Sequence, residues 1–232
     1  MLLLPLLVPA SGAPVFEVRT IQDAVHRGEP SALEGTKLVL RTAGGTVSIE
    51  CGDMLSAIAV QPPLRGPSPT SLLELADGDL LYGAVDSGKG DLLHFRGVGE
   101  DLLDVGVGSL RRWIQLGNSG GRAREAFAPA AEGDRLYVAA AGGLDHLDGT
   151  LSALDGDGFV FESAIGKSRK SFGEAVALVL APEGGAKPAT DLLALVELGD
   201  GSRVTGRLAG LAEGSLTLVP SWAKSLRVRI DR

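Results

Sequence analysis

Apolar residues in this chain alternate with polar ones over short stretches, the pattern of half-buried β-strands. The clearest example spans residues 195–208, where alternating apolar residues flank the pair Asp200-Gly201. An Asp-Gly pair between two such runs is a strong hairpin signal, because both residue types tolerate the positive φ of tight turns. Gly206 stands inside the second run. This stretch predicts a strand, a turn and a bent second strand.

The same pattern occurs 123 residues earlier. At that offset Asp77-Gly78 falls on Asp200-Gly201, and Gly83 falls on Gly206. Apolar positions further along also coincide, in steps of two, which is the spacing of one face of a strand. The match therefore predicts a repeated β-unit.

Two fainter copies are predicted elsewhere. When Gly149 is placed on Gly206, Phe159 and Phe161 coincide with apolar strand positions, and Gly28 aligns in the same way. Four in-strand glycines then mark the units at spacings of 55, 66 and 57 residues: Gly28, Gly83, Gly149 and Gly206. A position without a Cβ is expected wherever a strand bends sharply.

These patterns predict an all-β chain of tandem small SH3-like or Sm-like barrels. In the second unit the strands are expected near residues 72–75, 79–85, 91–95, 102–107 and 110–114. About five short strands in ~50 residues, with a bend in the second, suit such a barrel. We expect four units, of which the first and third are degenerate, at residues 15–61, 71–116, 134–181 and 191–232. A plain antiparallel meander is the alternative.

The last predicted unit is shorter than the second. Arg232 aligns with Ser109, so the counterpart of the closing strand at residues 110–114 is missing. Because open sheet edges are usually protected, we expect the natural chain to continue or another segment to supply that strand.

Residues 1–13 are apolar and include Val8-Pro9-Ala10, which resembles the cleavage site of a secretory signal. No lysine or arginine precedes Arg19, so the basic start of such a signal is lacking. We expect export to the periplasm, cell envelope or exterior; a first strand or a misassigned start is the alternative. The run is shorter than the ~20 residues of a membrane span, and no transmembrane segment is expected.

Net charge and residue content argue against several kinds of partner and binding site. A net charge of −7 argues against a nucleic-acid partner. Cys51 is the sole cysteine and cannot form an intramolecular disulfide. Residues 155–158 resemble half of a calcium loop but lack the acidic twelfth position, and no second histidine stands at metal-ligand spacing from His146. No metal and no cofactor are predicted.

One motif resembles a catalytic loop. Residues 117–121, Gly-Asn-Ser-Gly-Gly, are similar to the nucleophile loop of chymotrypsin-like serine proteases, which implies Ser119 as nucleophile. However, neither His26 nor His94 lies in a typical base setting, and the motif falls between two predicted units. No catalytic residue is therefore predicted, and the protease stays a less favoured alternative.

The two tryptophans are the candidates for ligand binding. Trp113 and Trp222 stand out in a chain with 4% aromatic residues, and each could anchor a partner or stack on a sugar ring. Trp222 lies between two predicted strands and is expected to be exposed, whereas Trp113 lies on a closing strand, where core packing is the competing role.

The sequence also resembles two kinds of known protein. Residues 73–85 and 196–208 look like the opening half of an Sm-like barrel motif, but the residues that carry RNA binding in that family are missing. The whole chain resembles uncharacterised secreted β-repeat proteins of planctomycete type. The leading hypothesis is thus a non-catalytic exported scaffold or binding module at the cell envelope, with an unknown protein or glycan as partner. A carbohydrate-binding module is the alternative.

Overall fold

A computed structural model of the chain describes residues 14–60, 68–97, 102–141, 143–182 and 193–230. The predicted export signal and the last two residues lie outside these ranges. The described residues form an all-β structure with three short 3-10 helices. None of them forms a helix with the length and hydropathy that a membrane span requires.

The strands of the first half are β1 (Phe16–Thr20), β2 (Val25–Glu34), β3 (Lys37–Thr42), β4 (Gly45–Glu50), β5 (Met54–Ala59), β6 (Ser71–Leu75), β7 (Leu80–Gly90), β8 (Leu92–Arg96), β9 (Leu102–Gly106) and β10 (Leu110–Gln115). Those of the second half are β11 (Asp134–Ala140), β12 (Gly143–Gly156), β13 (Gly158–Ser163), β14 (Gly166–Ser171), β15 (Ala175–Val179), β16 (Ala194–Glu197), β17 (Arg203–Ala212), β18 (Ser215–Pro220) and β19 (Leu226–Arg229). The 3-10 helices are η1 (Cys51–Asp53), η2 (Val107–Ser109) and η3 (Arg124–Ala126).

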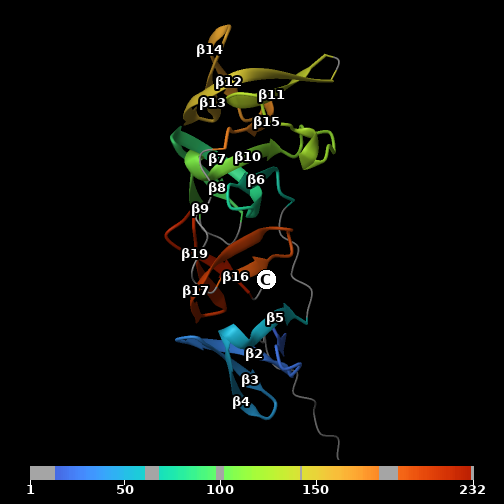
Figure 1. Cartoon of the computed structure of the whole chain (residues 1–232), viewed down its shortest axis with the longest axis vertical. Coiled ribbons are helices and arrows are strands. Elements are labelled where there is room, and N and C mark those ends of the chain that lie inside the picture. Colours follow the sequence, from blue (N-terminus) through green and yellow to red (C-terminus); the bar gives the residue numbers. More distant parts are fainter. Residues whose placement is uncertain (1–13, 61–67, 98–101, 142, 183–192, 231–232) are drawn as a thin grey trace, which may run out of the picture. The chain divides into compact units, whose positions relative to one another are not determined.

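The chain divides into two compact units. Unit 1 comprises Met1–Leu64, Ala209–Thr217 and Arg229–Arg232. Unit 2 comprises Arg65–Leu208 and Leu218–Val228. Figure 1 colours β1–β5 of unit 1 in blue and β6–β15 of unit 2 from green to orange.

The same strand order occurs in three segments. It reads β4-β3-β2-β1-β5 in unit 1, and β9-β8-β7-β6-β10 and β14-β13-β12-β11-β15 in unit 2. In each segment the fifth strand pairs antiparallel with the first. The strands β16–β19 follow the order of the first four, and the pairing described for β16 is with β17.

The period-two pattern located the strands of the second segment well. The predicted strands at residues 72–75, 91–95, 102–107 and 110–114 correspond to β6, β8, β9 and β10 within one or two residues. The second strand, predicted to end at residue 85, continues to Gly90. Its last residues pair with β12, a contact that no local pattern encodes.

The in-strand glycines lie against the ends of the third strands. A Cβ placed on each one would lie 2.6 Å from the carbonyl oxygen of Arg41 (at Gly28), 2.1 Å from that of Arg96 (at Gly83), 2.0 Å from that of Glu162 (at Gly149) and 3.0 Å from that of Val219 (at Gly206). The register of the second strand also shifts three residues later, at residues 30–32, 85–87 and 151–153. A glycine followed by a bulge bends the second strand, which then pairs with the first strand at one end and the third at the other.

Two of the segments in unit 2 join through matching strands. Trp113 of β10 lies opposite Leu178 of β15, and each of them is also opposite a buried leucine of its own first strand. Lys89 of β7 lies opposite Asp155 of β12. Because equivalent positions face each other, the contact between these segments has an approximate two-fold symmetry.

An aromatic cluster fills the core at this join. Trp113 is fully buried, with its ring centroid 5.0 Å from that of Phe159 and 6.0 Å from that of Phe172. Phe159 and Phe172 are also in edge-to-face contact, at 4.9 Å. These aromatic residues come from both segments, so the core stabilises their association.

We predict that Gly83→Ala destabilises the protein by about 1–3 kcal/mol, because the new methyl group would force the Arg96 carbonyl away. Gly106→Ala is the matched control, since Gly106 has open space around it and a φ of −67° that alanine adopts. Urea unfolding of both variants measures the difference. Equal stabilities would contradict the close approach at Gly83.

Candidate functional site

The two Asp-Gly turns of unit 2 have the same geometry. Asp77 accepts the backbone N–H of Asp79 at 3.1 Å, and Asp200 accepts that of Ser202 at 2.8 Å. The glycines between them have φ values of +95° and +93°, in the region that favours glycine. The aspartates at these turns thus act on their own backbone.

Asp79, the residue after the first turn, is buried and binds a distant part of the chain. Its Oδ1 accepts the backbone N–H of Thr205 at 2.8 Å. Its Oδ2 accepts the indole N–H of Trp222, also at 2.8 Å. Both carboxylate oxygens are therefore engaged by donors from β17 and the β18–β19 connection.

The contact is reciprocal. Ser202, the counterpart of Asp79 at the 123-residue offset, is buried and accepts the backbone N–H of Tyr82 at 2.9 Å. Tyr82 is in turn the counterpart of Thr205. Leu80 and Arg203, also counterparts, lie opposite each other where β7 meets β17. The residue after each turn thus supplies a side-chain acceptor for a backbone N–H of the strand that follows the other turn.

Burial sets the electrostatics of this contact. It raises the pKa of Asp79, and the neighbouring Asp77 carboxylate adds to the rise, while the bonds from Trp222 and Thr205 oppose it. Asp77 is itself held by the Ser221 hydroxyl, which donates to its Oδ2 at 2.6 Å.

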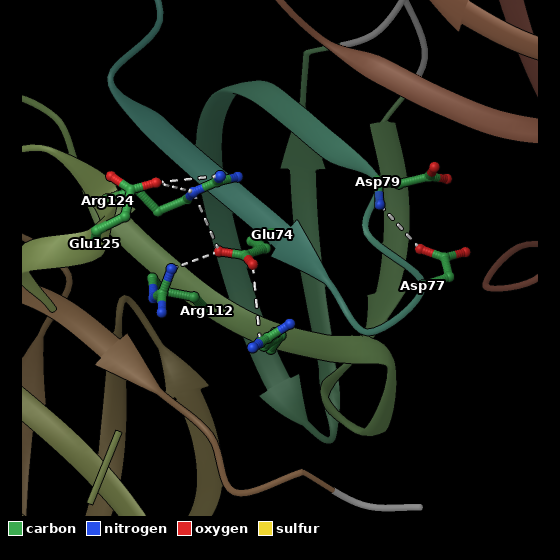
Figure 2. Close-up of polar contacts among 7 residues, drawn as sticks. Glu74, Asp77, Asp79, Arg112, Arg124 and Glu125 are labelled. Carbon is green, nitrogen blue, oxygen red and sulfur yellow. Dashed lines mark hydrogen bonds and ion pairs between the residues drawn. The ribbon is translucent and has the colours of Figure 1, made fainter. Parts of the chain in front are cut away.

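A second polar cluster lies on the same hairpin, around Glu74 of β6 (Figure 2). Arg112, opposite Glu74 on β10, donates from Nη1 to its carboxylate at 2.6 Å, and both side chains are nearly buried. The Nε atoms of Arg111 and Arg124 lie 3.8 Å and 3.7 Å from the same carboxylate. Arg124 also pairs with the exposed Glu125 at 3.3 Å. One buried carboxylate thus holds three guanidinium groups in place.

Neither tryptophan presents an open ring face. The expected exposure of Trp222 is wrong: the side chain is 9% exposed, because its indole N–H reaches into the interior to Asp79. Trp113 lies in the aromatic core. Stacking on a sugar requires an accessible ring, so these contacts lend no support to the glycan role of either residue.

Ser119 is buried, and its hydroxyl makes a hydrogen bond within its own loop. Its hydroxyl donates to the carbonyl of Leu116 at 2.9 Å. The neighbouring Asn118 donates its amide to the carbonyls of Gly173 and Ala175. His94 pairs elsewhere, with its Nδ1 2.6 Å from Asp104. The Asn118 bonds fasten the loop at residues 117–121 to the start of β15.

The other acidic positions also make internal contacts. In the turn at residues 155–158, Asp157 pairs with Arg169 of β14, which bonds the Asp155 carbonyl as well. His146 is exposed on β12, with its ring centroid 6.0 Å from that of Tyr137. Among the described residues no group of three or more metal-ligating side chains converges.

Sequence reasoning missed Asp79, Ser202 and Glu74. A usable signal existed for the first two: aligned at the 123-residue offset, both positions carry a short side chain with an acceptor oxygen directly after an Asp-Gly turn. For Glu74 the signal is a charge inside the otherwise apolar run 72–75, which indicates a buried and therefore paired carboxylate.

Comparisons of the chain with protein families, curated proteins and solved structures find no match.

We expect Asp79→Ala to lower the free energy of unfolding by about 2–4 kcal/mol, because it leaves the buried Trp222 and Thr205 donors without an acceptor. Trp222→Phe removes one of those donors and should cost less. The double variant should cost less than the sum of the two, since the residues interact directly. Chemical unfolding of the four proteins tests this coupling, and strict additivity would contradict it.

The raised pKa of Asp79 predicts a pH-dependent stability. A carboxyl whose pKa is higher in the folded state contributes most below its unfolded value near 3.8, and that contribution falls as pH rises through the folded pKa. The stability of the wild type relative to Asp79→Asn should therefore decrease as pH rises above about 4. Urea titrations from pH 3 to 8 measure it; a difference that grows with pH would contradict the raised pKa.

Proposed function

We propose that this chain is a non-catalytic exported repeat protein that acts as a scaffold or binding module at the cell envelope. It is built from four related β-units of the SH3-like or Sm-like barrel type, the last of which contributes four strands. We further propose that it is related to secreted β-repeat proteins of planctomycete type. The partner is another protein or a glycan.

Three features support the barrel units. The order 4-3-2-1-5 occurs in three segments. In two of them a 3-10 helix directly precedes the fifth strand, at η1 and η2. Each second strand bends at a glycine that meets the third strand. A bent second strand shared by two sheets and a fifth strand returned to the first are the features that curl five strands into a small barrel.

The observation that carries the scaffold function is the reciprocal contact between the two turns. Asp79 and Ser202 hold matching positions within unit 2, and each accepts a backbone N–H from the segment of the other. These polar side chains hold one segment of unit 2 to another. Repeat proteins held together by contacts of this kind bind partners on extended surfaces.

A reporter fusion tests the export. The chain is fused at its C-terminus to alkaline phosphatase, which is active only in an oxidising compartment, and produced in a Gram-negative host. We expect phosphatase activity with the complete chain and its loss when residues 1–13 are deleted, because the apolar run serves as the signal. Activity absent from the complete chain, with the fusion protein present in the cytoplasm, would contradict export.

A further inference from the structure

The edge strand β5 of unit 1 is apolar and exposed. In the strand order of unit 1 it is the terminal strand, and its described pairing is with β1. Leu55 and Ile58 are 61% and 65% exposed, and Ala57 is exposed as well. An edge strand of this kind offers unpaired backbone groups together with apolar side chains.

Charge distinguishes β5 from the other edge strands. Residues 54–60 carry no charged side chain. By contrast, β14 contains Lys167, Arg169 and Lys170, and β19 contains Arg227 and Arg229. Charges on an edge oppose pairing with another chain, so β5 lacks the protection that β14 and β19 have.

Unit 2 shows what covers the corresponding strand. There β10 and β15, the fifth strands of their segments, pair antiparallel with each other, with Trp113 opposite Leu178. Ala57 is the β5 counterpart of Trp113 and Leu178. Each of the three lies opposite a buried residue of the first strand in its own segment: Trp113 opposite Leu73, Leu178 opposite Leu136, and Ala57 opposite Val18. A fifth strand in this chain thus has a preferred neighbour, which is another fifth strand in antiparallel register.

We propose that β5 is a homodimer interface, at which it pairs antiparallel with β5 of a second copy of this chain. The register follows from β10 and β15. Ala57 lies opposite Ala57 of the second copy, and Ser56 lies opposite Ile58. Leu55 then faces Ala59, so each large apolar side chain is set beside a small residue. This interface deepens the proposed scaffold function and rests on it, since it links one repeat array to another.

Sedimentation velocity on the purified chain tests the dimer. At concentrations up to about 100 µM we expect a reversible species of twice the chain mass, since strand pairing of modest area gives micromolar dissociation constants. The double variant Leu55→Lys/Ile58→Lys should raise the dissociation constant at least about tenfold, because it puts charges on an apolar pairing edge and sets the new charge at position 58 diagonally across from that of the second copy. Ile165→Lys is the control: Ile165 is more exposed, at 88%, but lies in the β13–β14 turn, and its replacement should change nothing.

A cross-link tests the register. In a Cys51→Ala background, Ala57→Cys should form a disulfide-linked dimer under mild oxidation, because opposed residues of antiparallel strands have Cα atoms about 4.5–5.5 Å apart, within disulfide reach. Thr46→Cys on β4, the other edge of the same sheet, is exposed and should give no disulfide-linked dimer.

A monomer at all concentrations, or a dimer unaffected by Leu55→Lys/Ile58→Lys, overturns the interface. Cross-linking of Thr46→Cys as readily as Ala57→Cys overturns it too. Circular dichroism of each variant separates loss of pairing from loss of folding. The reporter fusion is read independently of these measurements, so failure of the dimer and failure of export are distinguishable.

Discussion

The fold depends on the close approach between an in-strand glycine and the end of the third strand. At Gly83 and Gly149 the space that a Cβ would need is already occupied by a carbonyl oxygen. Only a residue without a side chain lets the backbones come so near, and the bulge that follows completes the bend. The bent second strand then shares its length between two pairing partners. In the barrel units proposed above, this bend is what lets five strands close around a core instead of forming a flat meander.

The remaining strand edges of the segments in unit 2 determine how these segments associate. The fifth strands β10 and β15 cover one another, and the long second strands β7 and β12 meet at Lys89 and Asp155. At its start β7 meets β17, where Asp79 accepts the backbone N–H of Thr205 and Ser202 accepts that of Tyr82. Each contact sets equivalent positions face to face. The segments therefore pair through equivalent positions, as the subunits of a symmetric oligomer do, but within one polypeptide.

The features predictable from sequence are the local ones. Alternation placed β6 and β8–β10, and Asp77-Gly78 marked the turn, because strand faces and tight turns are encoded within a few neighbouring residues. The extension of β7 to Gly90 was not predictable, since its partner on β12 lies more than sixty residues away in sequence. The burial of Trp222 was missed for the same reason: its partner, Asp79, is 143 residues distant. Side chains that serve such remote partners leave no periodic signal in their own surroundings.

That separation has a consequence for how the chain matures. A ribosome must synthesise residue 222 before the carboxylate of Asp79 can meet its second donor, so this contact forms only after 143 further residues have been made. Loop-closure entropy delays such non-local contacts further. During that interval Asp79 faces water instead of the interior. In the export proposed above, such a delay leaves these contacts to form after the chain has passed the membrane rather than before it.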